Sequence, residues 1–130
     1  MSRRATIRMK DLPPTQRKRV QREKRIATAA AQAQFMAYVH AAGLPTPQPE
    51  HRFHPARKWR FDWAFVEARV ALEVEGGVWT EGRHTRGAGF VADMAKYNEA
   101  AALGWRIVRC VPDDLHSPAL LDLLRRALSV

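Results

Sequence analysis

The stretch from residue 60 to residue 75 alternates between apolar and polar side chains, and this alternation constrains the fold more than any other feature of the sequence. In the segment 60–65 every second residue is aromatic, and in the segment 70–75 every second residue is aliphatic. A period of two is typical of a strand with one buried face. We therefore predict a β-hairpin with a short turn over 66–69. Its apolar face consists of Phe61, Trp63, Phe65, Val70, Leu72 and Val74.

The rest of the chain predicts further strands and helices around this hairpin. Helices are expected where apolar residues recur at intervals of three and four, strands where they alternate, and breaks at prolines and glycines. We expect flexible chain over 1–16, helices over 17–42, 90–103 and 118–128, strands over 50–54 and 105–111, and a loop over 78–89. The order αβββαβα predicts an α/β fold, a mixed β-sheet flanked by helices.

Each predicted helix carries apolar residues that we expect to face the core. In the helix 90–103 they are Phe90, Met94, Tyr97 and Ala101. In the first and last helices they are Phe35, Met36, Val39, Leu120, Leu121, Leu124 and Leu128.

Positive charge is concentrated at the start of the chain. The net charge is +9, and residues 1–25 contribute +8 of it, with ten Lys or Arg against two acidic residues. We therefore divide the chain into a basic arm that includes the start of the first helix, 1–25, and a single domain, 26–130. Nucleic acid is the natural partner of such an arm; the alternative is a solvated tail that only keeps the protein soluble. The side chains expected to contact phosphates are Arg17, Lys18, Arg19 and Arg22.

Composition excludes several other classes of protein. With 46% apolar and 27% charged residues, the chain is neither wholly disordered nor collagen-like nor a coiled coil. No apolar run reaches the roughly 18 residues of a membrane span, and the N-terminus does not read as a secretory signal. The single cysteine, Cys110, excludes an internal disulfide and a cysteine-based zinc site. We expect a protein of a reducing cytoplasm that does not bind membranes.

Three acidic residues lie on the polar face of the predicted hairpin. With a turn of two or four residues, Asp62 lies opposite Glu73, and Glu75 follows on the same face. Three like charges at this spacing are destabilising unless they are neutralised. Mg²⁺ or Mn²⁺ would neutralise them, since both prefer oxygen ligands. Two alternatives stay open: a three-residue turn would separate Asp62 from Glu73, and arginines could pair with the acids at a solvated surface. Those arginines are Arg52, Arg60 and Arg69.

Four short segments together resemble small phage and prophage nucleases of the PD-(D/E)XK, or restriction-endonuclease-like, superfamily, which are related in fold to very-short-patch repair endonucleases. The segments are RKWRFDWAF at 57–65, EVEGGVW at 73–79, GRHTRG at 82–87 and the stretch 93–98 of the predicted helix. The resemblance covers about residues 32–112 and leaves the basic arm outside. It implies that 26–130 is a nuclease-like domain with a restriction-endonuclease-like fold.

The resemblance also implies roles for the acidic residues. Asp62 matches the aspartate that bridges the metal, and Glu73 matches the second acidic ligand. Glu75 stands where most members have a lysine that positions and deprotonates the attacking water, so Glu75 is either a third ligand or the base. Lys96, in the following helix, is a candidate for a relocated lysine. The alternative for Lys96 is a solvent-facing residue paired with Glu99 or Asp93.

Basic side chains near the acids are candidates for phosphate contacts. In the glycine-rich loop, Arg83 and Arg86 could hold phosphates, and His84 could protonate the leaving oxygen or bind a phosphate. The alternative is that His84 is a surface histidine of the loop without a role in catalysis or binding. Lys58 and Arg60 could contact phosphate or simply be surface charges. Trp79 could stack on a base, although packing against the core is the stronger interpretation.

These inferences lead to an expected function, a metal-dependent DNA endonuclease that hydrolyses phosphodiester bonds. Branched DNA and intermediates of repair or recombination are candidate substrates. The alternative is a non-catalytic DNA-binding protein that retains the nuclease fold; RNA cleavage and a homodimer also stay open. We expect a phage- or prophage-encoded protein in the cytoplasm of a bacterial host cell.

Overall fold

The structure, a computed structural model, describes residues 8–76 and 88–130 of the chain. The chain divides into two compact units, Met1–Gln34 and Phe35–Val130. Within the described ranges, no helix combines the length and the apolar composition needed to cross a membrane.

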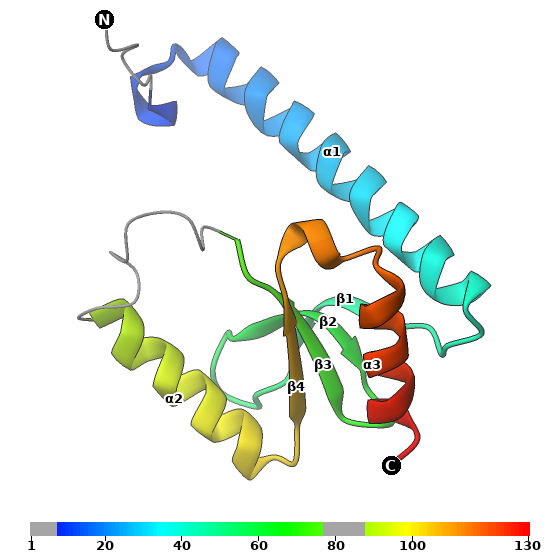
Figure 1. Ribbon diagram of the computed structural model, residues 1–130. Helices are drawn as coiled ribbons and strands as arrows, with labels where there is room; N and C mark the ends of the chain where they lie inside the picture. The colour runs from blue at the N-terminus through cyan, green and yellow to red at the C-terminus, as the bar shows by residue number, and fades with distance from the viewer. Residues whose placement is uncertain (1–7, 77–87) are drawn as a thin grey trace, which may run out of the picture. The chain divides into compact units, whose positions relative to one another are not determined.

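The described residues form a mixed α/β structure, as the sequence predicts (Figure 1). Short 3₁₀ helices lie at Met9–Asp11 and Pro112–Asp114. The remaining elements are α1 (Pro14–Ala41), β1 (Gln48–Arg52), β2 (Arg60–Phe65), β3 (Val70–Val74), α2 (Ala88–Ala102), β4 (Arg106–Cys110) and α3 (Pro118–Leu128).

The four strands form one mixed sheet in the order β1-β2-β3-β4. β1 and β3 both run antiparallel to β2, whereas β4 runs parallel to β3. The predicted hairpin is confirmed: β2 and β3 are joined by the four residues 66–69, and Phe65 pairs with Val70. This register, continued to the other end of the hairpin, places Asp62 opposite Glu73. The prediction for Phe61 is wrong, because its side chain packs in the cluster of Ala64, Ala71 and Trp105 rather than with Trp63 and Phe65.

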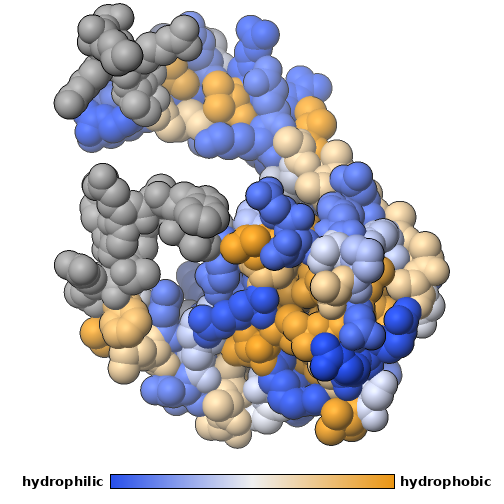
Figure 2. All heavy atoms as spheres, in the orientation of Figure 1, coloured by the Kyte–Doolittle hydropathy of each residue, from blue (hydrophilic) through white to orange (hydrophobic). Residues whose placement is uncertain are grey.

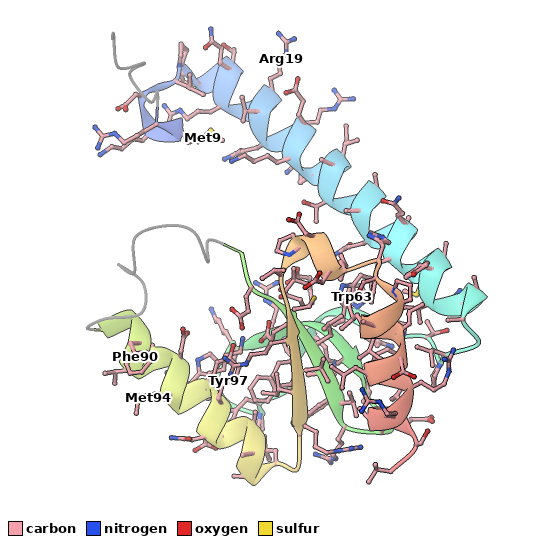
Figure 3. The ribbon with its side chains drawn as sticks, viewed as in Figure 1. Met9, Arg19, Trp63, Phe90, Met94 and Tyr97 are labelled. Carbon is pink, nitrogen blue, oxygen red and sulfur yellow. The ribbon has the colours of Figure 1, made fainter. Side chains whose placement is uncertain are left out.

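Helices cover both faces of the sheet (Figure 1). On one face, the apolar side of the hairpin packs against the last turns of α1 and against α3. On the other face, Ala64 and Ala71 pack against Ala100 of α2 and against Trp105. Figure 3 accordingly shows Trp63 on the α3 side and Tyr97 on the α2 side. The buried residues of the first face are Phe35, Val39, Trp63, Phe65, Val70, Leu72, Cys110, Leu120 and Leu124.

Predicted boundaries differ from the observed ones by up to three residues, most clearly at the starts of α1 and β1. α1 begins at Pro14 rather than at residue 17, because the fixed φ of proline suits the first turn, where its missing N–H costs no hydrogen bond. β1 begins at Gln48 and includes Pro49, which an edge strand tolerates.

The predicted core stripe of α2 is wrong. Phe90 and Met94 are each 49% exposed and Ala101 is exposed, whereas Ala100 is completely buried and Lys96 is largely buried. The cluster beneath α2 already holds the large side chains of Phe61 and Trp105 beside Ala64 and Ala71, and the small Ala100 of α2 packs against it. The helix therefore approaches the sheet through a small residue and a cation, and its large apolar residues stay near the surface.

Most basic residues of α1 are exposed to solvent, as predicted for the start of the first helix. All residues from 21 to 31 are exposed. Arg17 donates from Nε to the carbonyl of Leu12 (2.8 Å), and Arg19 forms a loose ion pair with Glu23 (3.4 Å). Most of the positive charge of α1 therefore has no acidic partner within the described residues.

Candidate active site

Two carboxylates face each other across the β2–β3 hairpin. Oδ2 of Asp62 accepts a hydrogen bond from the backbone N–H of Val74 (2.7 Å), and this bond fixes the aspartate against β3. Glu73 is only 6% exposed and is a buried charged residue in an otherwise apolar core. The hairpin thus brings together the two acids for which the sequence predicts metal ligation.

Helix α2 adds a lysine to this pair. Lys96 Nζ donates to Glu73 Oε1 at 2.6 Å, and only 16% of the lysine side chain is exposed. The ammonium group also lies 5.7 Å from the ring centre of Phe61 and 5.4 Å from that of Tyr97. The solvent-facing alternative for Lys96 is therefore wrong. Glu99, its proposed partner, contacts His54 instead (3.3 Å).

Burial raises the pKa of Glu73 from 4.5 to about 7. Lys96 opposes this shift through its hydrogen bond and its charge, while Asp62 adds to the shift through hydrogen bonding and like charge. The loss of solvation at Glu73 therefore outweighs the opposing effect of Lys96. Glu73 binds a proton more tightly than a free carboxyl group does.

This pKa predicts how the stability of the metal-free protein depends on pH. Glu73 binds its proton more tightly in the folded chain, so between pH 4.5 and 7 the folded state holds more protons than the unfolded state. Its contribution to the free energy of unfolding therefore falls as pH rises, by at most about 1.4 kcal/mol per pH unit. Glu73→Gln should remove this slope, which urea unfolding in EDTA at several pH values would measure. The exposed Glu67→Gln is the control, and identical slopes in wild type and Glu73→Gln would contradict the assignment.

Glu75 lies directly after β3 beside an arginine of β4. Its backbone N–H donates to the carbonyl of Cys110 (2.7 Å). Its Oε1 is buried, has no hydrogen-bond partner among the described residues and lies 3.8 Å from Nη1 of Arg109. Glu75 is thus held near the carboxylate pair.

Arg109 and Tyr97 are members of the site that the sequence did not indicate. The β3–β4 register places Arg109 opposite Glu73, and its guanidinium lies 4.0 Å from the ring centre of Tyr97. Burial, followed by the charges of Glu73 and Glu75, raises the pKa of Tyr97 to about 12, so the hydroxyl stays protonated. Figure 3 shows Tyr97 reaching from α2 toward β4.

A cavity of about 380 Å³ opens beside these residues, between α2, β4 and the end of β3. Glu75 and Arg109, which lie near the Asp62–Glu73 pair, also line this cavity. Its lining consists of Glu75, Phe90, Asp93, Met94, Tyr97, Asn98 and Arg109.

Among the described residues of the Phe35–Val130 unit, Lys58 and Arg60 are not brought to this cluster. Arg83, His84 and Arg86 lie outside the described residues, as does Trp79. Lys58 is exposed, and Arg60 lies 4.0 Å from Glu50 rather than on Asp62. Within the described ranges no ion pair joins the three acids to the arginines of the solvated-surface alternative, Arg52, Arg60 and Arg69.

The donor set suits a hard divalent cation only in part. Among residues 8–76 and 88–130, no three His, Cys, Asp or Glu side chains converge in the arrangement of a metal site. Mg²⁺, however, is commonly held by one or two carboxylates together with water and substrate phosphate. Asp62 and Glu73 provide two such carboxylates, and Oε1 of Glu75, which has no hydrogen-bond partner among the described residues, is a further acceptor. The residues present therefore fit Mg²⁺ or Mn²⁺ at the Asp62–Glu73 pair.

Comparison with known proteins gives no family. No family model matches the chain, and no solved structure matches it. Two uncharacterized proteins of Mycobacterium tuberculosis, one from strain CDC 1551 / Oshkosh and one from strain H37Rv, are each 33% identical over 75 residues. The match covers 56% of this chain and 26% of each relative, so the chain corresponds to about a quarter of these proteins.

Proposed function

We propose that the chain is a metal-dependent endonuclease with a restriction-endonuclease-like fold and that it hydrolyses phosphodiester bonds in DNA. One observation carries the proposal: Lys96 Nζ lies 2.6 Å from Glu73 Oε1, beside Asp62 on the neighbouring strand. Two carboxylates on a buried hairpin and a neighbouring lysine form the trio expected for a PD-(D/E)XK nuclease. Here the lysine comes from α2 rather than from the hairpin. The order of helices and strands is consistent with this proposal.

Each member of the trio has a distinct role in the proposed reaction. Asp62 and Glu73 would hold Mg²⁺ or Mn²⁺, which supplies positive charge that polarises the scissile phosphate and eases ionisation of the attacking water. Lys96 is held by Glu73, where its ammonium can orient that water and offset charge on the phosphate. Glu75 is the acceptor available to take a proton from the water.

The proposal is tested by incubating the purified full-length chain with supercoiled, linear, nicked and branched DNA, and with RNA. Each substrate is assayed with Mg²⁺, with Mn²⁺ and with EDTA. Cleavage of DNA that requires the metal supports the proposal. Binding of DNA without cleavage under any condition would favour a non-catalytic DNA-binding protein, and cleavage of RNA alone would change the substrate class.

The basic arm supports DNA as the partner and makes a separate prediction. Replacing Arg17, Lys18, Arg19 and Arg22 by glutamine should weaken DNA binding and flatten its dependence on salt. Each lost phosphate contact lowers the slope of log K against log salt by about 0.9, so four contacts lower it by about 3 to 4. Fluorescence anisotropy across a salt series measures this slope. The melting temperature of the variant should match that of wild type, and an unchanged slope would exclude these residues as phosphate contacts.

A further inference from the structure

The cavity between α2 and β4 combines apolar walls with hydrogen-bonding groups. Phe90, Met94 and Tyr97 supply a phenyl ring, a thioether and a phenol, while Asp93, Asn98 and Arg109 supply polar atoms. Phe90 and Met94 are each 49% exposed, so the large apolar residues of α2 stand open beside a charged site. In Figure 2 apolar surface lies over the first turns of α2, with hydrophilic side chains between it and β4.

The charges of the cavity indicate what it can hold. Glu75 and Asp93 place two carboxylates on the lining, and these repel a phosphate. The same carboxylates accept hydrogen bonds from N–H groups, and Asn98 both donates and accepts. A nucleobase is the part of a nucleic acid that combines flat apolar faces with such an edge.

Arg109 provides a stacking surface for that base. One face of its guanidinium lies 4.0 Å from the ring centre of Tyr97, which fixes the plane of the group. Half of the arginine side chain is nevertheless exposed. A planar guanidinium with one face covered and its surface open to the cavity can stack on a base.

We propose that this cavity binds an unpaired nucleobase of the DNA strand, directly beside the candidate active site. The inference rests on the proposed function, because the strand reaches the cavity through the phosphate at Asp62 and Glu73. A base inside a duplex is stacked and paired and does not enter such a cavity. The substrate class is therefore single-stranded DNA or duplex DNA with an extrahelical nucleotide, in preference to fully paired duplex.

The experiment compares two duplex oligonucleotides that differ only in a single-nucleotide bulge. One carries a normal base in the bulge and the other an abasic site. Binding to the full chain is measured by anisotropy in EDTA, so that no cleavage occurs. Wild type should bind the oligonucleotide with the base about tenfold more tightly, the value of one stacked base. The double variant Phe90→Ala/Met94→Ala should lose this preference, whereas Val91→Ala, which is 62% exposed and outside the lining, should keep it.

Equal affinity of wild type for the two oligonucleotides would overturn the inference, as would an equal loss of preference in Val91→Ala. The outcome is separable from that of the proposed function. Metal-dependent cleavage without preference for the base would refute the base-binding cavity alone. A preference for the base in a chain that never cuts DNA would refute the nuclease and leave a protein that binds unpaired bases.

Discussion

Lys96→Met is expected to lower DNA cleavage by at least about 100-fold, the usual contribution of a positioned acid, base or cation at a reacting group. Methionine fills nearly the same space along α2 but offers no ammonium to Glu73, whose Oε1 lies 2.6 Å from Nζ in wild type. At a pH high enough to ionise Glu73 in both proteins, the metal concentration needed for half-maximal activity should change little, since both carboxylates remain. Single-turnover cleavage across a metal titration measures both quantities, and wild-type activity in Lys96→Met would remove Lys96 from the mechanism.

The same substitution separates a structural from a functional role. Removing one partner of a buried ion pair costs up to about 3 kcal/mol. Because Lys96 lowers the pKa of Glu73, its loss raises that pKa further, and the destabilisation should be larger above pH 7 than below it. The double variant Lys96→Met/Glu73→Gln removes both charges and should restore the free energy of unfolding without restoring cleavage. If the double variant restored both, the pair would serve only the fold.

Alternation along residues 60–75 predicted the hairpin, whereas its register depended on the length of the turn, which the structure shows to be four residues. A strand with one buried face admits few pairings, and a four-residue turn leaves Asp62 opposite Glu73. The proximity of Asp62 to Glu73 follows from this local pattern. The sequence identified Lys96 as a candidate from its place in the following helix. It could not decide whether Lys96 faces the site or the solvent, because that depends on the rotation of α2 over the sheet.

The rotation of α2 about its own axis is set by the sheet surface against which the helix packs, and not by the apolar pattern of the helix itself. A helical stripe of large residues, Phe90, Met94 and Tyr97, predicts burial only if the facing surface is apolar and open enough to receive them. Here the buried side chains of Phe61 and Trp105 already occupy the facing surface together with Ala64 and Ala71, and the small Ala100 packs against this cluster. Because Phe90 and Met94 are not buried against the sheet, they remain at the surface and line the cavity.

Arg109 is a second residue whose place near the candidate site could not be predicted from the sequence. It joins the site only because β4 returns parallel to β3 after a crossover through α2, which places it opposite Glu73. No residue spacing within 106–110 indicates that pairing. In the sequence, Arg106 and Arg109 look like ordinary surface charges of a strand. The contacts of Arg109 with Tyr97 and Glu75 arise from tertiary structure alone.

Asp62→Asn is expected to abolish metal-dependent cleavage and most of the stabilisation by Mg²⁺ or Mn²⁺. In wild type, a cation that binds only the folded chain should raise the melting temperature by mass action. Asparagine has nearly the same size, and its carbonyl oxygen can still accept the hydrogen bond from Val74 N–H that Oδ2 of Asp62 accepts at 2.7 Å. The variant therefore loses a negative charge without losing the contact that fixes the side chain.

The metal-free Asp62→Asn protein should be as stable as wild type or more stable. Asp62 helps to raise the pKa of Glu73, so removing its charge lets Glu73 ionise against Lys96 with less repulsion. The control is Asp122→Asn on α3, where an exposed aspartate pairs with Arg126 and its loss should change neither cleavage nor the response to metal. A solvated, merely structural carboxylate at position 62 predicts no stabilisation of wild type by metal and no gain on neutralisation. Cleavage by Asp62→Asn at the wild-type rate would rule out this carboxylate pair as the active site, and the non-catalytic DNA-binding alternative would then account for the basic arm and the hairpin together.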